Sequence, residues 1–138
     1  MYTTQQEPWK EFFSPRPEDI VYEDAHVIAF RDKTPQAARH FLVVPRAVRI
    51  KGVEQLSREH VPLLNHMIQV GHHILNTTSL LPHQYRMGFH VKPFRSIPYL
   101  HMHCLLLPFR NTWQRIRFSE ASGGFISAFR LLGRIQAR

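Results

Sequence analysis

Cysteine is almost absent from this sequence, since its 138 residues contain only one, Cys104. A single cysteine cannot form an internal disulfide, and no apolar run is long enough to cross a bilayer. The chain also lacks a secretory start, so we expect an intracellular protein, cytoplasmic or nuclear, with no membrane partner. Acidic residues are few as well, 10 against 18 lysines and arginines. The resulting net charge of +8 predicts anionic partners such as nucleotides or nucleic acid.

The sequence contains no repeat, no low-complexity block and no linker that would separate two domains. A chain of 138 residues, 43% of them hydrophobic, can bury one substantial core. The first 19 residues are rich in proline and polar residues, and we interpret them as an arm in which Trp9, Phe12 and Phe13 are possible anchors. Residues 20–138 are then expected to form a single domain.

Short apolar stretches predict several strands. Residues 20–32, IVYEDAHVIAFRD, are typical of a hairpin, and HFLVVP from His40 predicts a buried strand that ends at Pro45. Two further strands are expected over residues 85–91 and 99–108. The expected strands are thus spread over both halves of the chain.

Two stretches carry helical periodicity instead. Residues 59–78 place apolar side chains at spacings of three and four, as in a helix that packs on a sheet. These side chains are Val61, Leu64, Ile68, Gly71 and Leu75. The stretch 123–138 opens with a glycine pair and then predicts a second amphipathic helix. The apolar stripe of this helix is expected at Phe125, Phe129, Leu132 and Ile135. This mixture favours an α+β domain built on a mostly antiparallel sheet.

Residues 99–108, YLHMHCLLLP, contain two histidines within an apolar run. Because side chains alternate along a strand, His101 and His103 share one face, while Leu100, Met102 and Cys104 share the other. Two imidazoles that faced a dry core would need partners for four ring nitrogens. We therefore expect the histidine face to border a cleft, where one ring can attack an anionic group while the other donates a hydrogen bond.

A zinc site is an alternative interpretation of the His-x-His pattern. It needs a third and usually a fourth ligand, for which His40 and His90 are candidates. Against it, Cys104 lies on the opposite face of the strand, and no acidic residue is nearby in the sequence. We therefore expect neither a metal nor any other cofactor.

Three segments together resemble the histidine triad (HIT) superfamily. The segment SIPYLHMHCLL is similar to the triad signature, VIAFRDKTPQAARHFLVVPR to the nucleotide-holding segment of Hint-type members, and RMGFHVKPF to the third Hint branch and the aprataxins. The resemblance implies a HIT-like fold with a five-stranded sheet and two main helices. One triad position departs from the family pattern. In the family, a serine lies five positions before the middle histidine, so Ser96 aligns His101 with that position and Tyr99 with the first histidine.

The resemblance also implies a role for each matching residue. His101 corresponds to the nucleophile, His103 to the phosphate-binding histidine, and Ser96 to the residue that assists the leaving group. Asp32 corresponds to the acceptor of ribose hydroxyl groups, and Tyr99 is expected to orient a neighbouring imidazole through its backbone carbonyl. The rest of the expected nucleotide site comprises Phe30, Lys33, His40, Leu42, His90 and Arg95.

Three functions follow as hypotheses. The first is a metal-independent phosphoramidase that hydrolyses adenosine phosphoramidates through a nucleotidyl-histidine. The second is an aprataxin-like deadenylase acting on nucleic-acid 5′ ends, motivated by the net charge and by GFHV, although no Cys or His follows Pro108 to form the zinc finger of aprataxins. The third is a nucleotide-binding module without turnover. The resemblance further implies a purine nucleotide substrate and a homodimer, with nucleic acid as a less favoured partner.

Overall fold

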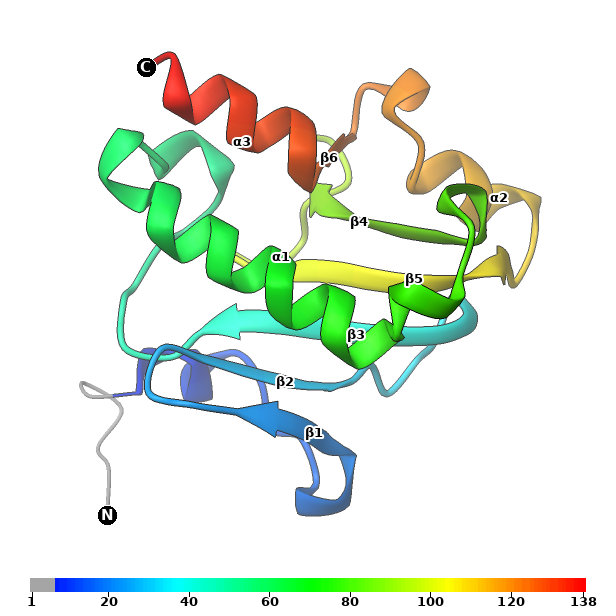
Figure 1. Cartoon of the computed structure of the whole chain (residues 1–138), viewed down its shortest axis with the longest axis horizontal. Coiled ribbons are helices and arrows are strands. Elements are labelled where there is room, and N and C mark those ends of the chain that lie inside the picture. Colours follow the sequence, from blue (N-terminus) through cyan, green and yellow to red (C-terminus); the bar gives the residue numbers. More distant parts are fainter. Residues whose placement is uncertain (1–6) are drawn as a thin grey trace.

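A six-stranded antiparallel sheet forms the centre of the protein, as a computed structural model that describes residues 7–138 shows (Figure 1). Neighbouring strands follow the order β1-β2-β3-β5-β4-β6, and every neighbouring pair is antiparallel. The strands are β1 (Ile20–Glu23), β2 (Val27–Arg31), β3 (Ala37–Pro45), β4 (Tyr85–His90), β5 (Met102–Phe109) and β6 (Phe125–Ser127). The α+β class with a mostly antiparallel sheet is confirmed.

Two helices cover one face of this sheet: α1 (Val61–Leu75) lies across β3 and β5, and α3 (Ala128–Gln136) packs beside it (Figure 1). The short helix α2 (Thr112–Arg117) follows β5. Beneath α1, the main core includes Leu100, Met102 and Cys104, the side chains that alternation assigns to this face. Within residues 7–138, no helix is long and apolar enough to span a membrane.

The expected five-stranded sheet is wrong by one strand, because residues 7–138 form six strands. The two main helices are α1 and α3, and the short α2 is additional. The extra strand, β6, lies within the stretch predicted to be helical. Gly123 adopts a φ of 79°, and the chain then pairs with β4, with Phe125 opposite His90. The helix begins only at Ala128, so its buried side chains are Ala128, Leu131 and Ile135, while Phe129 is 55% exposed.

The N-terminal arm covers part of the opposite face of the sheet. Trp9 and Phe13 are buried there and Phe12 is partly buried, as expected of anchors. They pack in a second cluster with side chains from β2, β3 and the segment before β5, namely Ile28, Phe30, Leu42, Val44 and Tyr99. The division of the chain at residue 20 stays a prediction, and residues 1–6 lie outside the described part.

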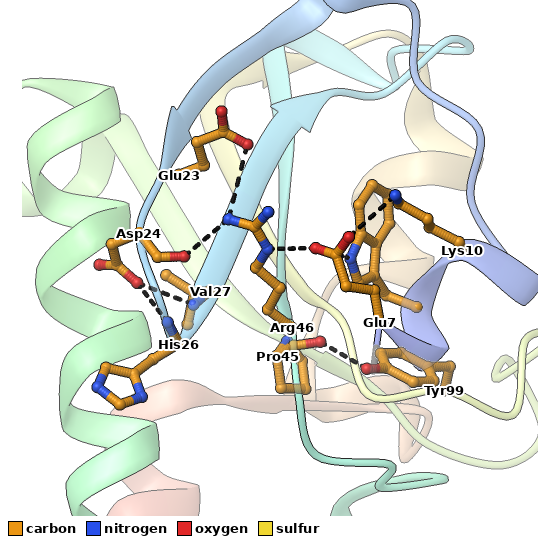
Figure 2. A network of polar contacts seen from close by, with 10 residues as sticks. Glu7, Lys10, Glu23, Asp24, His26, Val27, Pro45, Arg46 and Tyr99 are labelled. Carbon is orange, nitrogen blue, oxygen red and sulfur yellow. Dashed lines mark hydrogen bonds and ion pairs between the residues drawn. The ribbon is translucent and has the colours of Figure 1, made fainter. Parts of the chain in front are cut away.

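A buried carboxylate ties this arm to the sheet (Figure 2). The Glu7 side chain accepts hydrogen bonds from Arg46 and from Trp9, and it forms an ion pair of 2.9 Å with Lys10. Arg46 also donates to the carbonyl of Asp24 in the turn between β1 and β2, at 3.0 Å. Burial by itself would raise the pKa of Glu7, but the hydrogen bonds from these partners lower it. The carboxylate therefore stays ionised inside a largely apolar layer.

Gly88 of β4 leaves room for β6, and we expect Gly88→Ala to destabilise the protein by about 1–3 kcal/mol. A Cβ atom at this position would lie 2.3 Å from Cζ of Phe125 and 2.4 Å from the backbone oxygen of Ile126. Urea unfolding measures the change. Gly133→Ala is the control, because its Cβ would meet nothing within 4 Å and alanine favours a helix. Wild-type stability in Gly88→Ala would contradict this account of β6.

Candidate nucleotide-binding site

A cleft of about 750 Å³ opens on the face of the sheet opposite α1 and α3. The arm, the end of β2, strand β3, the segment before β5 and the end of α2 form its walls. Nearly all of the residues expected from the sequence border this cleft. They are Phe30, Asp32, Lys33, His40, Leu42, His90, Ser96, His101 and His103.

Strand register explains why these histidines meet. Leu42 of β3 and Gly88 of β4 both lie opposite His103 of β5. His40 and His90 are each two residues away from those positions, so their side chains point to the same face as His103. The ring centroids of His40, His90 and His101 consequently lie 5.1, 4.8 and 5.1 Å from that of His103.

Arg95 and Tyr99 do not line the cleft. The Arg95 guanidinium instead forms an ion pair with Glu54. The Tyr99 ring is buried beneath the arm, and its hydroxyl donates to the carbonyls of Pro45, at 2.5 Å (Figure 2), and of Val48, at 3.2 Å. Burial raises the pKa of this phenol, which keeps it protonated and able to donate.

The backbone of Tyr99 nevertheless acts on the site. Nδ1 of His101 lies 2.6 Å from the Tyr99 carbonyl oxygen, which can only accept a hydrogen bond. The proton of a neutral His101 ring is therefore on Nδ1. Nε2 then carries a lone pair, as a nucleophile requires.

A chain of hydrogen bonds holds His103 in the other tautomer, with its proton on Nε2. The backbone N–H of Gln36 donates to Nδ1 of His40 at 3.1 Å, so the proton of a neutral His40 ring is on Nε2. That proton is donated to Nδ1 of His103, 2.8 Å away. His103 therefore carries its own proton on Nε2, and this nitrogen is buried without a hydrogen-bond partner in the described part of the chain. It is a donor suited to an anionic ligand.

Burial keeps all four rings neutral. Desolvation lowers the pKa of His40 to about 4, although the carboxylate of Asp32 opposes the shift. Desolvation also lowers the pKa of His90 to about 4, with a further contribution from the charge of Arg117. The pKa of His103 is lowered well below 6.5 by burial and by the neighbouring histidines, and that of His101 is lowered by burial. The hydrogen-bond pattern of neutral rings therefore holds at neutral pH.

Asp32 lies directly after β2, at the side of the cleft. Its backbone N–H donates to the carbonyl of His40 at 2.9 Å, which fixes its place beside β3. Oδ1 accepts hydrogen bonds from the backbone N–H and the hydroxyl of Thr34. Oδ2 lies 3.6 Å from Nε2 of His40. The carboxylate is thus oriented at the border between the apolar part of the cleft and the histidines, where it can accept from hydroxyl groups.

Asp32, His40 and His103 could together hold a metal ion, because one ligand atom from each lies within 4.8 Å of the others. The two imidazole nitrogens concerned are also the ones that bond to each other. A cation between them would replace that hydrogen bond and change the proton on His103. Independence from metal ions stays a prediction, which a chelator tests directly.

Sequence reasoning missed several residues of the cleft. The sequence predicts Phe12 and Phe13 only as anchors of the arm, yet both line the cleft, and the Phe13 ring lies 5.6 Å from that of His101. Phe94, Arg117 and Phe118 line its other end. The signal for that end was the run WQRIRF, in which arginines alternate with apolar and aromatic side chains at the end of α2. Gln36 contributes its backbone N–H, so the type of residue at this position gives no signal of its role.

A sheet cleft with one imidazole lone pair, one imidazole N–H without a partner in the described residues and an adjacent carboxylate defines a histidine-based site for an anionic ligand that carries hydroxyl groups. The family model described as "Scavenger mRNA decapping enzyme C-term binding" matches residues 12–118. The chain therefore belongs to this family, as a Hint-type member of the histidine triad superfamily.

Two curated relatives cover most of the chain. The bifunctional adenosine 5′-phosphosulfate phosphorylase/adenylylsulfatase HINT4 of Arabidopsis thaliana is 39% identical over 85% of this chain and 82% of its own length. The adenosine 5′-monophosphoramidase HINT3 of Xenopus tropicalis is 32% identical over 86% and 78%. Among solved structures, the aprataxin ortholog Hnt3 of Schizosaccharomyces pombe shares the fold, with a TM-score of 0.62 and 20% identity over 93% of this chain and 70% of that one.

The pKa of His101 predicts the acidic limit of activity. Because this pKa lies below 6.5, the lone pair on Nε2 persists at pH values where an ordinary histidine is protonated. We expect kcat/KM to fall as the pH decreases, with its midpoint below pH 6.5. A pH profile with a substrate that does not itself titrate measures this. A midpoint at or above 6.5 would count against a buried neutral nucleophile.

Tyr99 contributes to stability through its side chain and to the site through its backbone. We expect Tyr99→Phe to lose about 1–3 kcal/mol of unfolding free energy, because two backbone carbonyls lose their donor. The kcat/KM value should stay near that of the wild type, since the carbonyl that orients His101 is unchanged. Urea unfolding and steady-state kinetics test the two halves. Lost activity with unchanged stability would assign the hydroxyl to the reaction instead.

Proposed function

We propose that the chain is a nucleoside phosphoramidase, which hydrolyses the P–N bond of adenosine 5′-monophosphoramidates through a nucleotidyl-histidine. The proposal rests on one observation: two adjacent neutral rings carry their proton on different nitrogens. His101 offers a lone pair on Nε2, and His103 offers an N–H on Nε2. One ring can attack phosphorus while the other binds a non-bridging oxygen. The HINT3 relatives carry the same activity in their names.

In the first step, Nε2 of His101 forms a bond to the α-phosphorus, and the bond from phosphorus to the amine breaks. The amine takes the electron pair of that bond and leaves with a proton drawn from solvent, which Ser96 at the border of the cleft is placed to pass on. The attacking ring becomes cationic, and the bond from Nδ1–H to the Tyr99 carbonyl strengthens as this charge develops. His103 donates to the oxygen that gains negative charge.

In the second step, water attacks phosphorus and the bond to His101 breaks. The hydroxyl group of water stays on phosphorus and its proton goes to solvent, which restores neutral His101 and releases AMP. The base fits the apolar end of the cleft, where Phe13, Phe30 and Leu42 meet. Asp32, between that end and the histidines, is placed to accept from the ribose hydroxyls.

The test uses a fluorogenic adenosine phosphoramidate, with a chelator present throughout. We expect wild type to turn it over and His101→Ala to lose activity by a factor of about 10³ or more, because no nucleophile remains. His83→Ala is the matched control, since His83 is exposed and outside the cleft. Intact-mass measurement after rapid quenching should find one adenylyl group on wild type only.

Two outcomes would count against the proposal. Activity that disappears with chelator and returns with zinc would assign the reaction to a metal at Asp32, His40 and His103. AMP binding without turnover by wild type would favour the nucleotide-binding module. An aprataxin-like deadenylase has weaker support, because the likeness to Hnt3 extends to the fold alone.

We also propose a homodimer and an intracellular location. Both rest on the family resemblance, and the location rests also on the single buried cysteine. Sedimentation of the purified protein measures the first, and imaging of a tagged chain in cells the second.

A further inference from the structure

The two ends of the cleft differ in chemistry. At one end, the arm and β2 supply Phe12, Phe13 and Phe30. The arginines there have partners: Arg16 is paired with Asp19 at 2.9 Å, and Arg31 donates to the carbonyl of Glu18 at 3.1 Å. At the other end, beyond His90, the wall is formed by Phe94, Phe118 and Arg117. If the base occupies the apolar end and the phosphate lies at His101 and His103, the leaving group extends toward the end that contains Arg117.

The positive charge of Arg117 faces this site rather than a carboxylate. Its guanidinium carbon lies 5.9 Å from the Phe94 ring centroid and 5.6 Å from that of Phe118, so the two rings bracket it. Nη1 donates to Oε1 of Gln114 at 2.6 Å. No acidic residue among residues 7–138 lies within ion-pair distance of it. Burial is the largest cause that lowers the pKa of His40, His90 and His103. The charge of Arg117 is a further cause for all three, which places this charge close to the histidines.

The backbone at this position is anchored as well. Nε2 of His90 donates to the carbonyl of Arg117 at 3.0 Å, which ties the end of α2 to β4. The N-cap of α2 is formed by Asn111, whose side chain accepts from the backbone of Gln114 at 2.9 Å. The guanidinium is therefore presented by a fixed segment, and a substitution of its side chain leaves these backbone contacts intact.

We propose that Arg117 is a specificity-determining residue that selects nucleotidyl substrates whose leaving group is an oxyanion, such as sulfate. This inference rests on the proposed function, since it concerns the same nucleotidyl-histidine. An uncharged amine gains little from a guanidinium as it departs. An oxyanion that takes the electrons of the breaking bond gains negative charge, which Arg117 stabilises most in the transition state.

Adenosine 5′-phosphosulfate is the appropriate probe, because its leaving group is sulfate. Nε2 of His101 forms a bond to phosphorus, and the bond from phosphorus to the bridging oxygen breaks. Sulfate leaves with that electron pair and needs no proton. Water then releases AMP from His101, as for the phosphoramidate. The two substrates therefore share the second step and differ only in the group that departs first.

The experiment compares kcat/KM for adenosine 5′-phosphosulfate and for adenosine 5′-monophosphoramidate. In Arg117→Gln, we expect the phosphosulfate-to-phosphoramidate ratio to fall by about tenfold or more relative to wild type. Arg117→Lys should restore part of the ratio, because it keeps the charge but loses the planar guanidinium. Arg115→Gln is the matched control: it removes the same charge from the same helix, but Arg115 is exposed and outside the cleft.

The ratio separates specificity from a general effect on the histidines. Loss of both activities in proportion, an equal effect in Arg115→Gln, or no hydrolysis of the phosphosulfate by wild type would overturn the role of Arg117. In each of these cases, wild-type turnover of the phosphoramidate would leave the proposed function standing. If wild type hydrolysed neither substrate, both proposals would fall. Thermal unfolding of each variant checks that the fold is retained.

Discussion

The direction of one chain of hydrogen bonds determines the chemistry of this cleft. The backbone N–H of Gln36 can only donate, so Nδ1 of His40 must accept, and each later proton in the chain follows from that constraint. If Gln36 did not donate, His40 and His103 could exchange roles, and His103 would face the ligand with a lone pair instead of an N–H. A phosphate oxygen would then meet a repulsive partner. A backbone amide thus sets the protonation of a residue far along the chain.

The same reasoning explains how a tyrosine can serve at position 99, which the family resemblance aligns with the first triad histidine. What the site takes from position 99 is a carbonyl oxygen, which any residue supplies. The side chain is free to serve the fold, and here it fills the layer beneath the arm, with its ring centroid 5.5 Å from that of Phe12 and 6.0 Å from that of Phe13. The same two phenylalanines border the cleft. Tyr99 therefore links the packing of the arm to the orientation of His101.

The sequence predicted the parts of this site that depend on local alternation. The apolar residues between the histidines indicated which face of β5 each side chain occupies, and the structure places Cys104 in the core and His103 at the cleft. The family motifs led to Asp32, His40 and Ser96. Contacts that depend on strand register were not predictable in this way, because Leu42 and Gly88 come to lie opposite His103 only once the sheet is assembled. The short strand β6 and the position of Arg117 depend on turns whose geometry residue types do not specify.

The net positive charge of the protein and the neutral state of the histidines in the cleft are related. A cationic surface attracts nucleotides, but it also disfavours protonation of any histidine nearby, and burial adds to that effect. Arg117 acts in both ways, since its charge borders the cleft and contributes to the lowered pKa of His90 and His103. A carboxylate at this position would draw protons onto the rings and block the lone pair of His101. Asp32, which also borders the cleft, opposes the effect of Arg117. Its Oδ2 lies 3.6 Å from Nε2 of His40, and its charge raises the pKa of His40 and of His101, while Thr34 donates to its Oδ1. Burial outweighs this carboxylate, so the pKa of both histidines stays below 6.5 and the rings that attack and bind phosphate remain neutral.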